Sequence, residues 1–202
     1  MEFDREEYVG KLVFHQFLGN GCIIGGDSLG GFNIQFDLFP ERSIWIHKKV
    51  HHFEMGLSEK KENAWLQSLS EPLQTLWRDL VCWETYMEYA IDECMGEFEE
   101  FEHEVYQREC LAEALHRYQQ VYGEPSAQWY TELARIDQRF IDHTVPSFDG
   151  RSLLSANDPE VFWYYFRFPK ICQKDIEKLS EGQIFAPDSM GCFYCSSSIH
   201  DE

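Results

Sequence analysis

The sequence lacks the long apolar runs of membrane-spanning chains and the leader of exported ones. Its apolar stretches all stay below the length of about 18 residues that marks a candidate transmembrane helix. The N-terminal residues do not have the charged-then-apolar order of a signal peptide. We therefore expect a cytoplasmic protein that does not interact with membranes.

Signatures of common enzyme classes are also missing. The chain contains no Gly-x-x-x-x-Gly-Lys-Ser/Thr phosphate loop, no His-Glu-x-x-His zinc motif and no Gly-x-Ser-x-Gly nucleophile turn. Its seven cysteines are an odd number at irregular spacings, which does not suggest a disulfide framework. These absences favour a non-enzymatic function in a reducing compartment.

Basic residues are scarce. The chain has 17 Lys and Arg against 36 Asp and Glu, which gives a formal net charge of −19. Aromatic residues make up 16 % of the chain, so this is the composition of a folding protein and not of a disordered acidic one. A chain this acidic repels nucleic acid and anionic membranes and attracts basic partners. Residues 51–150 hold most of the excess, with 21 acids against seven bases.

Residues 11–53 have the composition of short strands separated by turns. Phe32, Ile34 and Phe36 alternate with polar residues, the period-two pattern of a half-buried strand. The four predicted strands lie in KLVFHQF, GCIIGG, FNIQFDLF and RSIWIHK. Four strands of this length predict a small SH3-like or Tudor-like barrel over residues 1–56.

The same segment carries a pattern of Phe-Gly-x-Gly, two β-forming residues, a turn, and an alternating strand that ends in Phe-Asp. The matching positions are Phe17, Gly19, Gly21, Ile23, Ile24, Ile34 and Phe36, with Leu18 as one inserted residue. In this respect it resembles the Tudor-like modules at the end of UvrD/PcrA-type helicases and of related transcription-associated domains. The resemblance covers roughly a fifth of the chain. It implies a module that docks a protein and has no catalytic role.

His47, His51 and His52 end this segment together with Lys48 and Lys49. Clustered histidines suit a metal ion or a locally basic patch. We interpret these five residues as a solvated strand end, the commoner use of such a group.

From Ser58 the apolar spacing becomes helical. Ser70-Glu71-Pro72 predicts a helix start, and a seam with alternating steps of three and four residues follows up to Cys94. The next apolar residue is Phe98, one position later than the alternation predicts, and Gly96 lies in this interruption. We expect one long helix bent near Gly96, or two helices joined there.

A further helix is predicted over residues 126–143, folding back across Gly123–Pro125 to form a helix hairpin. Its predicted buried side is formed by Trp129, Leu133, Ile136 and Phe140. Residues 144–157 are interpreted as a loop, residues 158–168 as a buried helix, and residues 171–181 as another helix. The predicted fold is therefore α+β and mostly α. It consists of the small barrel followed by an antiparallel helical bundle with a long bent helix and an irregular tail, over residues 57–202.

Cys192 and Cys195 form the one closely spaced cysteine pair, with the spacing of a zinc knuckle. A structural zinc needs four ligands, and Cys172 and His200 are the candidates to complete the set. Buried or free thiols are the alternative. Zinc is the single cofactor that the sequence suggests.

The stretch from Glu84 to Glu113 contains eleven carboxylates and a single arginine, Arg108. Carboxylates along a helix imitate a row of phosphates, and like charges at these spacings need a compensating interaction. We therefore predict a non-enzymatic inhibitor or immunity-type protein that neutralises a basic protein, a nuclease or another nucleic-acid-binding protein. The predicted partner-binding residues are Glu84, Glu88, Asp92, Glu93, Glu97, Glu100 and Glu104.

Two other functions remain open. A metal-dependent enzyme or sensor would use a carboxylate and histidine site in the helical bundle. Its candidate ligands are Glu93, Glu97, Glu100 and His103. A docking adaptor would bind a polymerase or helicase through the barrel. The apolar seam is compatible both with packing inside one chain and with a homodimer.

Overall fold

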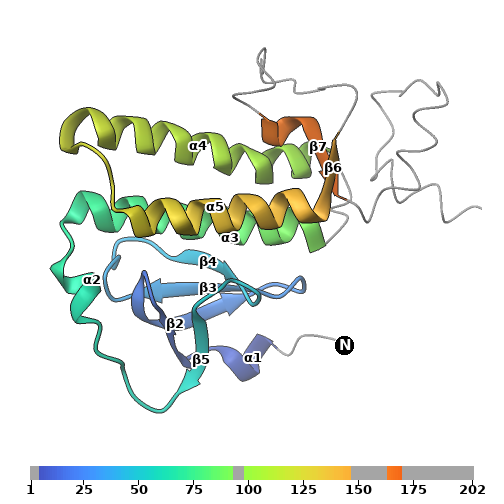
Figure 1. Cartoon of the computed structure of the whole chain (residues 1–202). Helices are drawn as coiled ribbons and strands as arrows, with labels where there is room; N and C mark the ends of the chain where they lie inside the picture. The colour runs from blue at the N-terminus through green and yellow to red at the C-terminus, as the bar shows by residue number, and fades with distance from the viewer. Residues whose placement is uncertain (1–4, 93–97, 147–162, 170–202) are drawn as a thin grey trace, which may run out of the picture.

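The computed structural model describes residues 5–92, 98–146 and 163–169 and has an α+β fold (Figure 1). A short helix α1 (Arg5–Tyr8) leads into an antiparallel sheet, and longer helices pack on one side of that sheet. No helix in the described ranges is long and apolar enough to cross a membrane.

The sheet has five strands in the order β4-β3-β2-β1-β5, with every neighbouring pair antiparallel. They are β1 (Leu12–His15), β2 (Gly19–Gly26), β3 (Gly31–Phe36), β4 (Ile44–His47) and β5 (Phe53–Leu57). The predicted α+β fold is confirmed. Strands β4 and β5 are the two edges of the sheet, so the predicted SH3-like or Tudor-like barrel is not closed. The sequence analysis also did not predict β5, a short edge strand whose three central residues are exposed.

The helices are α2 (Ala64–Ser68), α3 (Glu71–Asp92), α4 (Phe98–Tyr122) and α5 (Ala127–His143). Since α3 and α4 are separate helices that pack side by side, the long bent helix is wrong and the alternative of two helices is confirmed. Gly123 ends α4 with a φ of +81°, a conformation that favours glycine. The Ser126 hydroxyl accepts the Trp129 N–H and begins α5. The predicted helix at 126–143 is confirmed, and its four predicted core residues are buried.

The segment after α5 differs from the prediction. Thr144–Pro146 form strand β6, which pairs antiparallel with β7 (Arg167–Pro169), and the 3-10 helix η1 (Trp163–Phe166) precedes β7. The predicted loop and the end of the predicted buried helix are therefore wrong here. The physical reason is visible at Arg167, whose guanidinium donates to the Thr144 hydroxyl at 2.7 Å and holds β7 against the end of α5. The predicted start at residue 158 and the helix at 171–181 lie outside the described residues.

Helix α3 lies between the sheet and the other helices and contacts β4, α4 and α5. It is consequently buried on nearly every side and not only along its seam. Its buried residues off the seam include Trp77, Val81, Thr85 and Ile91. One continuous hydrophobic core contains residues of the sheet and of the helices, so the regions predicted as residues 1–56 and 57–202 fold against each other.

Tyr89 of α3 fastens the sheet to this helix at a point where only glycine leaves room. Its hydroxyl donates to Asp27 Oδ2 at 2.6 Å. The other oxygen, Oδ1, accepts the backbone N–H groups of Leu29 and Gly31, both at 2.8 Å. A Cβ atom at Gly31 would lie 1.6 Å from the Tyr89 hydroxyl, so any side chain there must displace Tyr89.

We predict that Gly31→Ala lowers the free energy of unfolding by about 2 kcal/mol, the usual cost of overpacking a tight site. Gly25→Ala is the matched control in the neighbouring strand, since its added Cβ meets only Asn33 at an ordinary 3.7 Å. Urea unfolding followed by tryptophan fluorescence measures both. Equal stabilities for the two variants would contradict the Tyr89 contact.

Candidate functional site

The structure buries three of the seven carboxylates that were predicted to meet a partner. Glu84 is 3 % exposed, Glu88 is 0 % exposed and Glu104 is 7 % exposed. The expectation of an exposed acidic ridge is therefore wrong at these positions. The side chains of the other four residues lie outside the described part of the chain, and for them the prediction stands untested: Asp92, Glu93, Glu97 and Glu100.

Two arginines of α5 neutralise the buried acids of α3. Arg139 reaches both carboxylate oxygens of Glu88, with Nε to Oε1 and with Nη2 to Oε2 at 2.8 Å. Arg135 Nη2 donates to Glu84 Oε1 at 2.6 Å, and the His51 backbone N–H donates to the same oxygen at 3.1 Å. Burial raises the pKa of Glu84, and Arg135 opposes that effect. Because a buried carboxylate without a partner costs several kcal/mol, these pairs hold α5 against α3.

A third pair ties in helix α4. Arg108 forms two parallel hydrogen bonds to Asp137 of α5, both at 2.9 Å. The Trp83 indole of α3 donates to the same carboxylate at 3.0 Å. One acid on α5 therefore connects all three helices, and we call these three pairs the inter-helix ion pairs.

The spacing of these pairs fixes the direction of α5. Glu84 and Glu88 are four residues apart, as are Arg135 and Arg139, and each pair spans 51 positions. A constant offset means that α3 and α5 run parallel, with one face of each helix turned toward the other. The matching four-residue spacing of acids and arginines was the sequence signal that would have predicted these pairs.

The predicted histidine cluster divides in the structure. His47 packs its ring against Tyr89, at 5.0 Å between centroids. His51 and His52 stack at 3.8 Å, and His52 Nε2 lies 3.9 Å from Glu132 Oε1. Within the described residues, no group of three or more His, Cys, Asp or Glu has the arrangement of a metal site.

A residue that the sequence analysis missed, His15, joins this group from β1. It is fully buried, and its Nδ1 accepts the Phe17 backbone N–H at 3.1 Å. Its Nε2 has no hydrogen-bond partner among the described residues. Burial, with the charge of His52 as the next cause, lowers the pKa of His15 to about 3. His15 therefore stays neutral in the folded protein at ordinary pH.

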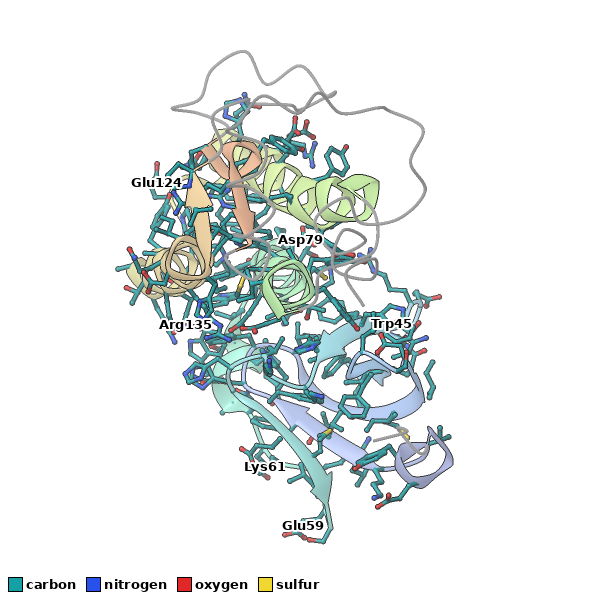
Figure 2. The ribbon with its side chains drawn as sticks, turned by 90° about the vertical axis from the view of Figure 1, so that its right-hand side faces the viewer. Trp45, Glu59, Lys61, Asp79, Glu124 and Arg135 are labelled. Atoms are coloured by element: carbon teal, nitrogen blue, oxygen red, sulfur yellow. The ribbon has the colours of Figure 1, made fainter. Side chains whose placement is uncertain are left out.

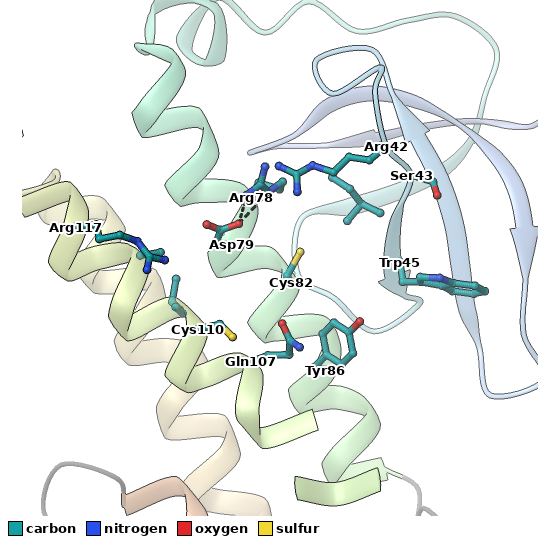
Figure 3. A pocket seen from close by; sticks show the side chains of 13 residues that line it. Arg42, Ser43, Trp45, Arg78, Asp79, Cys82, Tyr86, Gln107, Cys110 and Arg117 are labelled. Carbon is teal, nitrogen blue, oxygen red and sulfur yellow. Dashed lines mark hydrogen bonds and ion pairs between the residues drawn. The ribbon is translucent and has the colours of Figure 1, made fainter. Parts of the chain in front are cut away.

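On the other side of α3, opposite Arg135 in the view of Figure 2, a cavity opens near Trp45. It has a volume of about 330 Å³ and is lined by β4, α3, α4 and the turn before β4. Figure 3 shows Arg42, Arg78 and Arg117 reaching toward this space from the turn, α3 and α4. We call it the arginine groove. A wider hollow of about 630 Å³ shares Arg78 and Arg117 and continues along α3 and α4 to Tyr122.

The thiols at the arginine groove are poor nucleophiles. Burial raises the pKa of Cys82 to about 12, and burial also raises the pKa of Cys110. Neither forms a thiolate readily at neutral pH, so cysteine chemistry has little support here. Cys22, Cys82 and Cys110 are free thiols in the structure. The zinc ligands proposed from the sequence lie outside the described residues: Cys172, Cys192, Cys195 and His200.

Comparison with family models, with curated proteins and with solved structures finds no match to this chain. The Tudor-like resemblance of residues 11–53 therefore depends on the sequence pattern alone.

The inter-helix ion pairs give a stability prediction. Glu88→Gln keeps the shape of the side chain but leaves Arg139 without its carboxylate, so we expect a loss of about 3 kcal/mol in the free energy of unfolding. Glu113→Gln is the control, because its pair with Arg117 is exposed on both sides and is worth less than about 1 kcal/mol. Urea unfolding measures both variants. A loss at Glu88 no larger than that at Glu113 would overturn the role of the pair.

His15 gives a prediction for pH. Above about pH 6.5 this histidine is neutral in the folded and unfolded states, so it costs no stability. As the pH falls from 6.5 towards 3, the unfolded chain binds a proton that the folded chain excludes, and stability falls. His15→Asn keeps an acceptor for Phe17 but cannot titrate. Its stability should therefore fall less steeply between pH 6 and pH 4, by up to about 1.4 kcal/mol per pH unit.

Chemical unfolding at several pH values measures this difference. His116→Asn on the exposed face of α4 is the control, and its curve should run parallel to that of the wild type. If the His15 variant also ran parallel to the wild type, the buried neutral state of His15 would be wrong.

Proposed function

We propose that this protein is a non-enzymatic acidic binding protein that neutralises a basic, nucleic-acid-handling protein. The proposed contact surface is the end of the α3–α4 hairpin. This keeps the predicted partner but moves the contact away from Glu84, Glu88 and Glu104, which are buried.

The observation that carries the proposal is the charge of residues 92–102. They hold six carboxylates and no lysine or arginine. Helix α3 ends at Asp92 and α4 begins at Phe98, so this acidic segment connects the two helices along the chain. Within these residues the charge is of a single sign.

The arginines of the bundle support this argument because each is engaged by a carboxylate on a described helix. Arg108, Arg135 and Arg139 form the inter-helix ion pairs, while Arg78 and Arg117 pair with Asp79 and Glu113. The charges of Arg108, Arg135 and Arg139 are compensated by acids inside the bundle.

The field of an acidic segment mainly accelerates association. Complementary charge raises association rates by about 10- to 1,000-fold over neutral encounter, and salt reduces the gain. An inhibitor benefits from this because it must reach its target before the target reaches nucleic acid. The same row of carboxylates would compete with phosphates for the basic surface of the target.

The test compares two fourfold variants that remove the same number of negative charges. The first is Asp92→Asn, Glu93→Gln, Glu97→Gln and Glu100→Gln. The control replaces exposed acids on other parts of the chain: Glu41, Glu59, Glu62 and Glu71, each to Gln. A partner is captured from a lysate of the native cell on the immobilised wild-type protein and identified by mass spectrometry.

Association of the purified partner is then measured at low and high salt. We expect the first variant to bind about tenfold more slowly at low salt, and the control to change little. The difference should largely disappear near 0.5 M salt, where screening acts within about 4 Å. Equal slowing of both variants, or a rate that does not depend on salt, would overturn the proposal.

A further inference from the structure

We propose that the arginine groove is a binding site for a small phosphate monoester. Arg42, Arg78 and Arg117 extend into one cavity from three separate elements (Figure 3). Among the residues that the structure describes, Asp79 is the one carboxylate in the lining of that cavity. The lining therefore carries a net charge of about +2 inside a chain whose net charge is −19.

The three guanidinium groups differ in how firmly they are held. Arg78 is buried to 8 % exposure, donates through Nε to Asp79 at 2.9 Å and lies over the Phe39 ring at 5.6 Å. It forms a fixed donor at the groove, which reduces the entropy lost on binding. Arg117 is shared with Glu113 in an exposed pair, a weak interaction that an anion can replace.

Arg42 gives the clearest indication of an anionic ligand. Its side chain makes no ion pair with any residue that the structure describes, although carboxylates outnumber bases by two to one in the chain. It points into the groove beside another guanidinium, an arrangement that raises electrostatic repulsion. An anion between the arginines converts this repulsion into charge-assisted hydrogen bonds.

Phosphate fits this lining better than a carboxylate does. A single guanidinium already saturates a carboxylate in a bidentate pair, whereas a phosphate monoester offers three terminal oxygens. Its charge at neutral pH, about −1.5 to −2, matches the net charge of the lining. The Cys82 thiol adds no negative charge, since burial keeps it protonated.

The remaining lining suits the organic part of such an ester. Tyr86 and Trp45 border the same cavity and provide aromatic surface. A volume of about 330 Å³ is at the lower end of the range for small-molecule sites, which excludes a bulky ligand. An aromatic phosphate is therefore a suitable probe.

Isothermal titration calorimetry with phenyl phosphate tests the proposal on the full chain, with inorganic phosphate and benzoate as companion ligands. We expect saturable binding of phenyl phosphate, weaker binding of inorganic phosphate, and the weakest binding of benzoate. The double variant Arg42→Gln and Arg117→Gln changes two exposed side chains, so its fold should be kept. It should weaken phenyl phosphate binding about tenfold or more.

The matched control is Lys48→Gln with Lys60→Gln, which removes two positive charges from exposed sites outside the groove. It should change the affinity less than about twofold, because neither lysine lines the groove and salt screens exposed charges. Circular dichroism and urea unfolding check that both variants are folded. Three results would each overturn the proposal: no saturable binding of phenyl phosphate, equal weakening in both double variants, or benzoate binding as tightly as phenyl phosphate.

Discussion

The structure of the helices depends on the burial of Glu84 and Glu88 on α3. A carboxylate in a protein interior is tolerated only when a cation or several hydrogen bonds accompany it. Arg135 and Arg139 meet this requirement from α5, and they can do so only if α5 runs parallel to α3 with a fixed offset. Hydrophobic packing alone permits neighbouring registers, because leucine-like side chains adapt to one another. The two ion pairs exclude those registers, since a shift by one turn would leave one acid buried without its arginine.

Helix α3 also connects the helical part of the fold to the sheet through polar contacts. Glu84 also accepts the His51 backbone N–H, and Tyr89 donates to Asp27, which organises the turn between β2 and β3. The sheet that they join to α3 is open. A closed five-stranded barrel would turn its interior away from α3, whereas in the open sheet edge strand β4 packs directly on that helix. The open sheet and the helices consequently share one hydrophobic core.

Sequence patterns predicted the elements of this fold that bury only one face. The predicted bounds and core residues of α5 agree with the structure, because that helix has one apolar face, a serine cap and a glycine stop before it. The one-sided pattern did not predict the burial of α3, because that helix has neighbours on several sides. Glu84 and Glu88 therefore lie in the interior, although their spacing resembles that of a solvated face. It also missed β6 and β7, since three-residue strands depend on a partner far along the chain. The arginine groove was not predicted for a related reason. Its three arginines are far apart in sequence, and no local motif links them.

The charges of the molecule therefore separate into three classes with different physical roles. The charges of the inter-helix ion pairs cancel as a set, and these pairs determine how the helices are aligned along one another. Those of residues 92–102 are of one sign, and we propose that they act at long range on a basic partner. The groove is positive although the chain is strongly negative, and at physiological salt the field of distant carboxylates decays within about 8 Å. An anion at the groove consequently responds mainly to the nearby guanidinium groups of Arg42, Arg78 and Arg117, and the net charge of −19 does not prevent its binding. A basic macromolecule, the partner that we propose, would in contrast interact with many carboxylates at once, so ligands of the two signs would bind at separate places.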